Sequence, residues 1–197
     1  AMAGTMMAMA AFLDSLGIEK AHLVGHSYGG IMGTGFHRAY PDKVLSLTLA
    51  QPVIGGGVVD PAAREEGIRE RFALVEKIGM QKYAEQHVPQ SCAPGADAAV
   101  LARGIALTAA IPQSGYLRQF RSLRHANIFE WTSRPRIPAM IVSGEYDSTA
   151  ATGMGEQIAK PMRGIRHEQI ADIGHMIYLE YPERFNALLE GLLAEVE

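Results

Sequence analysis

The stretch AHLVGHSYGG, residues 21–30, places one serine between glycines where an apolar run gives way to small residues. The run at 21–24 is typical of a short buried strand, and the residues after Gly29 favour a helix. A Gly-x-Ser-x-Gly turn between a strand and a helix holds the serine side chain above the sheet on a strained backbone, with glycines where a Cβ would clash. The pattern predicts Ser27 as a nucleophile; the alternative is a glycine-rich turn with an incidental serine.

This position also suits the stabilisation of negative charge. The serine sits at the N-terminus of the predicted helix, where the helix dipole and free N–H groups favour a developing anion. The backbone N–H of Tyr28 is directed at the place where an oxyanion would form.

Composition limits the classes of function that the chain can have. With 197 residues, 48% hydrophobic and 20% charged, it is long enough for one domain with a substantial core. The net charge of -3 and the lack of a Lys/Arg run argue against nucleic-acid binding. The single cysteine, Cys92, excludes an internal disulfide and suits a cytoplasmic protein. Residues 1–11 are too few to span a membrane and lack the basic start of a signal peptide.

Strand-like and helix-like segments alternate along most of the chain. After 21–24, apolar runs predict strands at 44–50 and 139–143, and a fourth strand is expected at 166–170. Helices are predicted at 6–16, 29–40, 153–160 and 182–196. This order predicts an α/β fold, a mostly parallel sheet with helices on both faces. Residues 54–134 contain only helix-like segments (61–79, 81–87, 97–110 and 116–126), so we expect a helical insertion between core segments 1–53 and 135–197.

A serine hydroxyl needs a base, and a base needs an orienting carboxylate. Among seven histidines, His175 stands in a Gly-His loop after the last predicted strand, where parallel sheets place their chemistry, whereas His26 is expected to point away and serve packing. Asp147 follows the strand at 139–143 and is the preferred carboxylate; Glu145 and Asp172 are the rivals. No histidine–carboxylate cluster has metal spacing and no phosphate-binding loop with lysine occurs, so neither metal nor cofactor is expected.

The stretches GHSYGG, SGEYD and GHM resemble the α/β-hydrolase fold superfamily, as do FHRAYPDKVLSLTLAQP and IGHMIYLEYPERFNALLEGLL. The resemblance implies an N-terminally shortened α/β-hydrolase fold in which 54–134 takes the place of the helical cap. It implies Ser27 as nucleophile, Asp147 as acid, His175 as base and the Tyr28 N–H as one oxyanion donor. The implied function is a serine hydrolase for a small carboxylic ester, working through an acyl-enzyme.

The sequence departs from the family at its N-terminal side. It has no His-Gly pair of the kind that opens the loop supplying the second oxyanion N–H, and no residues for the strands that precede 6–16. The strand at 21–24 would then be an exposed apolar edge, so we expect self-association or a complementing partner chain. The glycines at 55–57 could replace the missing donor or serve as a flexible connection.

Other functions stay open at this point. Similar sites hydrolyse lactones, cleave carbon–carbon bonds or form peroxyacids, whereas epoxide and haloalkane chemistry uses an aspartate nucleophile. The missing half-sheet supports an alternative, a catalytically impaired hydrolase-like chain that binds a ligand or a partner chain.

Overall fold

The computed structural model describes residues 2–131, 135–149 and 154–196. Its described strands form one parallel sheet in the order β1-β2-β3-β4, the order in which they occur along the chain. The strands are β1 (Ala21–His26), β2 (Val44–Ala50), β3 (Ala139–Gly144) and β4 (Arg166–Ile170). All four were predicted, and β1 and β3 are longer than predicted at their carboxyl ends. The predicted α/β fold class is confirmed.

The sheet is buried on both faces because its central strands are apolar on both. Leu47 and Leu49 of β2 pack with Ile31 on one side, in a cluster that also contains Ile141 of β3. Met140 and Val142, the neighbours of Ile141, point to the other side and pack with the last helix. This alternation follows from the period of two along a strand.

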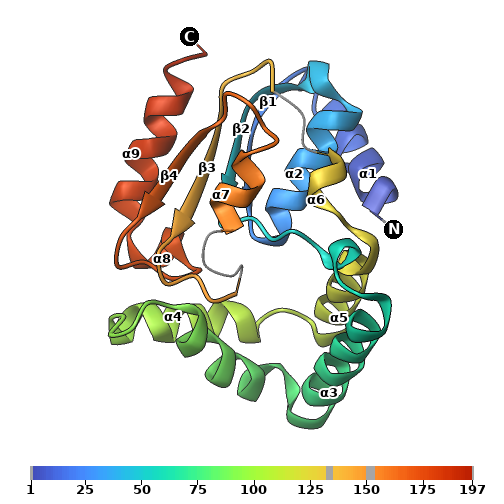
Figure 1. Cartoon of the computed structure of the whole chain (residues 1–197), viewed down its shortest axis with the longest axis vertical. Coiled ribbons are helices and arrows are strands. Elements are labelled where there is room, and N and C mark those ends of the chain that lie inside the picture. Colours follow the sequence, from blue (N-terminus) through green and yellow to red (C-terminus); the bar gives the residue numbers. More distant parts are fainter. Residues whose placement is uncertain (1, 132–134, 150–153, 197) are drawn as a thin grey trace.

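Helices cover each face of the sheet (Figure 1). Helices α2, α6 and α7 contribute to the cluster on one face, with α1 packed against α2, and helices α8 and α9 contribute to the other. These helices are α1 (Met2–Ser15), α2 (Tyr28–Ala39), α6 (Ile128–Trp131), α7 (Met154–Ala159), α8 (Ile177–Glu180) and α9 (Pro182–Leu193), with the 3-10 helix η1 (Pro41–Lys43) after α2. None of the described helices is long and apolar enough to span a bilayer.

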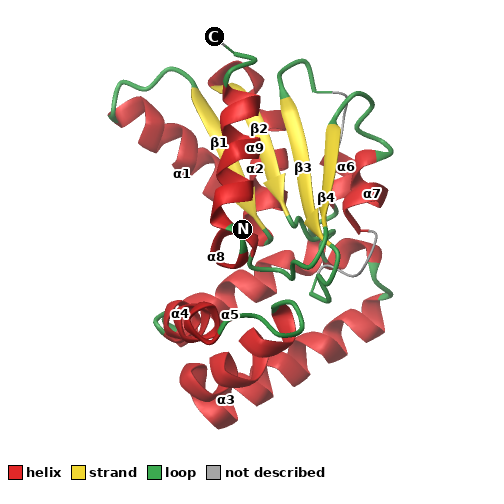
Figure 2. Ribbon diagram, turned by 90° about the vertical axis from the view of Figure 1, so that its left-hand side faces the viewer, coloured by secondary structure: helices red, strands yellow, loops and turns green. Residues whose placement is uncertain are grey.

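A layer of further helices lies beyond the carboxyl ends of the strands (Figure 2). It contains η2 (Gly56–Val58), α3 (Pro61–Ser91), α4 (Ala98–Ala109), α5 (Gln113–Ser122) and η3 (Leu123–His125). The described residues between β2 and β3 contain no strand, as expected. The division into a core at 1–53 and 135–197 and a cap at 54–134 stays a prediction.

Several helix bounds differ from the predicted ones. The predicted helices at 61–79 and 81–87 form one element, α3, which is kinked at Gly79 (φ 74°) and runs on to Ser91. Helices α6 and α8, four residues each, were not predicted because one turn is too short to show a helical period. The predicted helix at 153–160 begins at a residue outside the described ones.

Strand β1 lies at one edge of the described sheet, as predicted. Its only hydrogen-bonded strand neighbour in the described chain is β2, and the Val24 side chain is 53% exposed. The edge is therefore apolar and open on one side.

Candidate active site

Ser27 occupies the turn between β1 and α2 in a left-handed backbone conformation (φ 53°, ψ -112°). Such a conformation costs a non-glycine residue about 1–3 kcal/mol. The turn is held to the sheet because the Ser27 N–H donates to the carbonyl oxygen of Ala50, 2.9 Å away. The sequence prediction of a strained serine at a strand–helix junction is confirmed.

Close backbone contacts explain two of the glycines around Ser27. A Cβ on Gly25 would come within 2.2 Å of the carbonyl oxygen of Gly29, and one on Gly30 would come within 2.8 Å of the Pro52 Cβ. A Cβ on Gly29 would meet nothing within 4 Å. The expectation that glycine is needed on both sides of the serine was therefore wrong for Gly29, because its Cα faces open space.

Asp147 and His175 face one another in a buried pair. The Nδ1 atom of His175 lies 2.9 Å from each carboxylate oxygen of Asp147, and the two residues are 5% and 3% exposed. Since a carboxylate can only accept, Nδ1 carries the proton and the Nε2 atom of a neutral ring is left as an acceptor. That is the state in which a histidine can take a proton from a hydroxyl.

The rival carboxylate Glu145 makes a different contact. Glu145 accepts a hydrogen bond from the backbone N–H of Asp172 at 3.2 Å, and both residues are exposed. Neither is hydrogen-bonded to His175 in the structure. Glu145 therefore joins the loops after β3 and β4.

The loop that carries His175 is fixed by the carboxylate of Glu180. Its oxygens accept from the backbone N–H groups of Gly174 and Met176, both at 3.0 Å, which flank His175. The same carboxylate accepts from Ala93 N–H at 2.7 Å, at the end of α3. Sequence reasoning missed Glu180, because its partners are backbone groups that leave no mark in the sequence.

Gln51 holds the same loop from the sheet side. It follows β2 in a left-handed conformation (φ 46°) and is 1% exposed. Its side chain donates to the carbonyl oxygen of Gly174 and accepts from Ile177 N–H at 3.3 Å. A buried polar side chain directly after a strand was the signal that could have identified it.

His26 contacts His175 instead of pointing away from it. Its Nε2 donates to the backbone oxygen of His175 at 2.7 Å, and the two rings lie 4.7 Å apart. Burial, followed by the nearby His175, lowers the pKa of His26 to about 4, so the ring is neutral near pH 7. The expectation that this residue serves packing alone was wrong, because β1 continues through His26 and carries its ring beneath the His175 loop.

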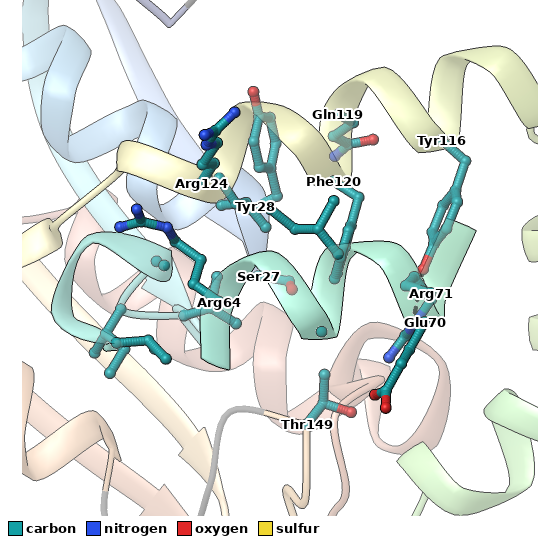
Figure 3. A pocket seen from close by; sticks show the side chains of 18 of the residues that line it. Ser27, Tyr28, Arg64, Glu70, Arg71, Tyr116, Gln119, Phe120, Arg124 and Thr149 are labelled. Carbon is teal, nitrogen blue, oxygen red and sulfur yellow. Dashed lines mark hydrogen bonds between the residues drawn. The ribbon is translucent and has the colours of Figure 1, made fainter. Parts of the chain in front are cut away.

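Ser27 and His175 line one cavity of about 880 Å³ between the sheet and the helical layer (Figure 3). Its aliphatic and aromatic walls come largely from the segment between β2 and β3. These lining residues are Val53, Ile54, Val59, Ile68, Leu74, Ile111, Phe120 and Leu123. Three arginines, Arg64, Arg71 and Arg124, also line it. The cavity suits a ligand with an apolar body and a polar or charged end.

His87 of α3 is a further ionisable group in this cavity, and sequence reasoning did not identify it as part of the site. Burial, then the charge of Arg71 and the nearby His175, lowers its pKa to about 4. Its ring stacks on Tyr83 with centroids 5.1 Å apart. A neutral imidazole therefore faces the same space as His175.

The glycines at 55–57 form a tight contact between the two ends of the helical layer. The Gly57 N–H donates to the carbonyl oxygen of Ala126 at 2.8 Å, so it is not directed at a substrate. A Cβ on Gly55 would come within 2.3 Å of that same oxygen. Glycine is needed here for close approach rather than for a flexible connection.

The described residues contain no group of three or more His, Cys, Asp or Glu side chains that could hold a metal ion. His22 and His167 are hydrogen-bonded to the hydroxyls of Ser46 and Ser143, 2.8 and 2.7 Å away. Both histidines are therefore parts of contacts between neighbouring strands.

The chain is similar to known hydrolases in sequence and in structure. A family model described as alpha/beta hydrolase fold matches residues 4–182. A 2-hydroxy-6-oxononadienedioate/2-hydroxy-6-oxononatrienedioate hydrolase of Paraburkholderia phymatum is 25% identical over 93% of this chain, which spans 65% of that protein. A 3-oxoadipate enol-lactonase of Acinetobacter baylyi is 26% identical over 94% of this chain, and the match covers 68% of that protein.

Solved structures agree with this placement. A thermophilic esterase from Thermogutta terrifontis superposes with a TM-score of 0.84 at 22% identity, over 95% of this chain and 70% of that one. The enol-lactonase from Burkholderia xenovorans superposes with a TM-score of 0.81 at 22% identity, over 98% of this chain and 73% of that one. The strained serine turn, the sheet order and the family match over most of its length show that this chain belongs to the α/β hydrolase fold family.

Proposed function

We propose that this chain is a serine hydrolase that cleaves small carboxylic esters or lactones through an acyl-enzyme. One observation carries the proposal: a buried Asp147–His175 pair opens onto the same cavity as the strained Ser27. A strained serine that shares a cavity with an oriented imidazole suits the activation of a weak hydroxyl as a nucleophile.

The proposed reaction assigns one role to each side chain. The Ser27 Oγ attacks the acyl carbon while Nε2 of His175 takes its proton, and Asp147 holds the Nδ1–H and stabilises the imidazolium. The N–H of Tyr28, at the start of α2, donates to the oxyanion. His175 then protonates the leaving alkoxide. A water deprotonated by His175 attacks the acyl-enzyme, and the proton returns to Ser27 as the acid is released.

The relatives support hydrolysis and leave the substrate open. Their names include an enol-lactonase, an oxononadienedioate hydrolase and a putative carbamate hydrolase from Azorhizobium caulinodans, the last at 27% identity. An ester or lactone fits the apolar walls of the cavity, because its acyl or alcohol part can be buried there. Because the chain spans about two thirds of the length of these relatives, their activities enter here as support only.

Hydrolysis of p-nitrophenyl acetate and butyrate tests the proposal. The Ser27→Ala variant should lose the burst of p-nitrophenol and labelling by a fluorophosphonate probe, with the fold retained by circular dichroism. The Ser15→Ala variant is the matched control, because that exposed hydroxyl donates to the Phe12 carbonyl oxygen within α1 and does not line the cavity. Equal turnover by wild type and Ser27→Ala would refute the proposal.

The open edge of β1 favours a second candidate, a catalytically impaired hydrolase-like chain that binds a ligand or a partner chain. An apolar strand edge with an exposed Val24 can pair with a strand of another molecule, either a second copy or a complementing segment. Light scattering at micromolar concentration tests the pairing. A monodisperse monomer would refute association between copies, and turnover that depends on Ser27 would refute the impaired state.

A further inference from the structure

We propose that Arg71 binds a carboxylate of the substrate, so that the preferred esters or lactones carry a negative charge distant from the reacting carbonyl. The proposal rests on the proposed hydrolase function and names the substrate class of the same cavity. It is carried by the way in which the Arg71 side chain is held and by the hydrogen-bond donors that it keeps unused.

The Arg71 guanidinium is fixed by aromatic side chains from two helices. Its Nη1 donates to the hydroxyl of Tyr83 of α3 and, at 2.9 Å, to the hydroxyl of Tyr116 of α5. The Tyr116 hydroxyl in turn donates to Tyr83 at 2.8 Å. The guanidinium carbon also lies 5.1 Å from the ring centroid of Phe120 and 5.3 Å from that of Tyr83. The group is thus oriented before any ligand arrives, which reduces the entropy that binding would cost.

These contacts leave most of the guanidinium donors unused. A guanidinium has five N–H groups, and the two on Nη1 are directed at the phenols. The remaining three, on Nε and Nη2, have no hydrogen-bond acceptor among the described residues. One edge of a guanidinium with two parallel donors is the group that binds a carboxylate in a bidentate manner.

No carboxylate in the described chain neutralises this charge. Arg71 makes no ion pair there, although Glu70 lines the same cavity, whereas Arg64 and Arg124 both pair with Glu65. The phenol of Tyr83 is neutral, since burial raises the pKa of Tyr83 well above its usual range. A half-buried cation without an anionic partner favours an anionic ligand.

The position of Arg71 relative to the reacting groups fits a substrate that reaches from one to the other. Arg71 and Tyr116 lie on one side of Ser27 in the view of the cavity, and Arg64 and Arg124 lie on the other (Figure 3). The positive charge of Arg71 also affects His87, which lines the same cavity. After burial, it is the second cause of the lowered pKa of His87. A substrate whose acyl carbon lies at Ser27 can therefore place a terminal carboxylate at Arg71.

The competing interpretation is that Arg71 only joins α3 to α5. A structural strut and a carboxylate-binding group differ in one measurable respect, the dependence on substrate charge. Loss of a strut lowers turnover of every ester alike. Loss of a carboxylate partner lowers turnover of anionic esters selectively, by about ten- to hundredfold for a charge-assisted bidentate pair.

The test compares two p-nitrophenyl esters of one dicarboxylic acid, glutaric or adipic acid. In the first ester the second carboxyl is free, and in the second it is capped as a methyl ester, which keeps the length and removes the charge. The ratio of the kcat/KM values for the two esters is measured at neutral pH for wild type, Arg71→Gln, Arg71→Lys and the control Arg69→Gln. Arg69 lies on the same helix, pairs with Glu66 and is largely exposed.

We expect wild type and Arg69→Gln to prefer the anionic ester by about tenfold or more. The Arg71→Gln variant should lose this preference with less than about a threefold change for the capped ester, and Arg71→Lys should keep part of it. A wild-type ratio near one, or an equal loss for both esters in Arg71→Gln, would overturn the proposal. If Arg71→Gln does not fold, the wild-type ratio and its fall with added salt decide the question alone.

A second measurement separates this proposal from the proposed function. Binding of glutarate to the Ser27→Ala variant is measured by calorimetry, with and without the Arg71→Gln change. Binding that requires Arg71 supports the carboxylate site even if Ser27 proves not to be a nucleophile. Equal binding by both variants, or none to either, would overturn the site while leaving ester hydrolysis unaffected.

Discussion

Replacing Glu180 with glutamine should weaken the loop that carries His175. The Glu180 carboxylate accepts three backbone hydrogen bonds, from Ala93, Gly174 and Met176, at 2.7 to 3.0 Å. Glutamine has nearly the same shape but only one acceptor oxygen, and its NH₂ group would face at least one of these N–H groups. At least one hydrogen bond is lost and the others lose the charge that strengthens them.

The size of the effect follows from these contacts. A hydrogen bond to a charged group contributes about 1.5–3 kcal/mol, and an unsatisfied N–H costs a similar amount. We therefore expect the free energy of unfolding of Glu180→Gln to fall by about 2–3 kcal/mol, or a melting temperature lower by about 5–10 °C. At temperatures where the variant is folded, displacement of the imidazole should lower kcat for ester hydrolysis on the order of ten- to hundredfold.

Thermal unfolding by circular dichroism and p-nitrophenyl butyrate turnover measure the two effects. The matched control is Glu183→Gln, an exposed carboxylate in the first turn of α9, where only a helix-dipole contribution of about 0.3–1 kcal/mol is at stake. A Glu180→Gln protein that melts like the control and hydrolyses like wild type would refute the view that this carboxylate positions His175.

Three further changes test other parts of the site. Asp147→Asn should keep the fold but lower kcat on the order of 10²–10⁴-fold, because an amide can hold His175 in the wrong tautomer; an unchanged pH–rate profile would contradict this. Gly25→Ala should destabilise the fold by several kcal/mol in urea titration, since its Cβ would lie 2.2 Å from the Gly29 oxygen, while Gly29→Ala should change it by less than about 1 kcal/mol. Because the folded pKa of His26, about 4, lies below the ordinary 6.5, the unfolded chain takes up a proton first as the pH falls. The proton uptake of His26 should therefore lower the free energy of unfolding by about 3 kcal/mol between these values, and the total decline should be smaller by that amount in His26→Gln.

Local sequence patterns were sufficient to predict the turn at Ser27 and the contact between Asp147 and His175. The apolar run at 21–24 and the glycines around Ser27 identify a strand–helix turn without knowledge of any other residue. Asp147 and His175 follow buried strands, and the carboxyl ends of parallel strands meet at one edge of the sheet, so their proximity could be inferred.

The supporting contacts could not be inferred in this way. The backbone partners of Gln51 are 123 and 126 positions away, and those of Glu180 are 4, 6 and 87 positions away. Backbone groups are the same in every sequence. Arg71 is one of many arginines in the sequence until α3 and α5 bring two tyrosines to it. Such roles depend on tertiary contacts rather than on any period or motif.

The loop that carries His175 joins the sheet to the helical layer, and this has a consequence for how the site responds to substrate. From the sheet side the loop is held by Gln51 and His26, and from the helical layer by the end of α3. The His175 N–H donates to the Ser91 oxygen at 2.6 Å.

Helix α3, which ends at Ser91, also carries Arg71, and it is kinked at Gly79 between the two. A ligand bound at the Arg71 guanidinium is therefore linked through one helix to the imidazole that would act on it. A shift of the second half of α3 therefore moves hydrogen-bond partners of the His175 loop, whereas the turn at Ser27 is fixed to β2 through Ala50. The position of the proposed base relative to the proposed nucleophile thus depends on the helical layer, which also forms most of the apolar wall of the cavity.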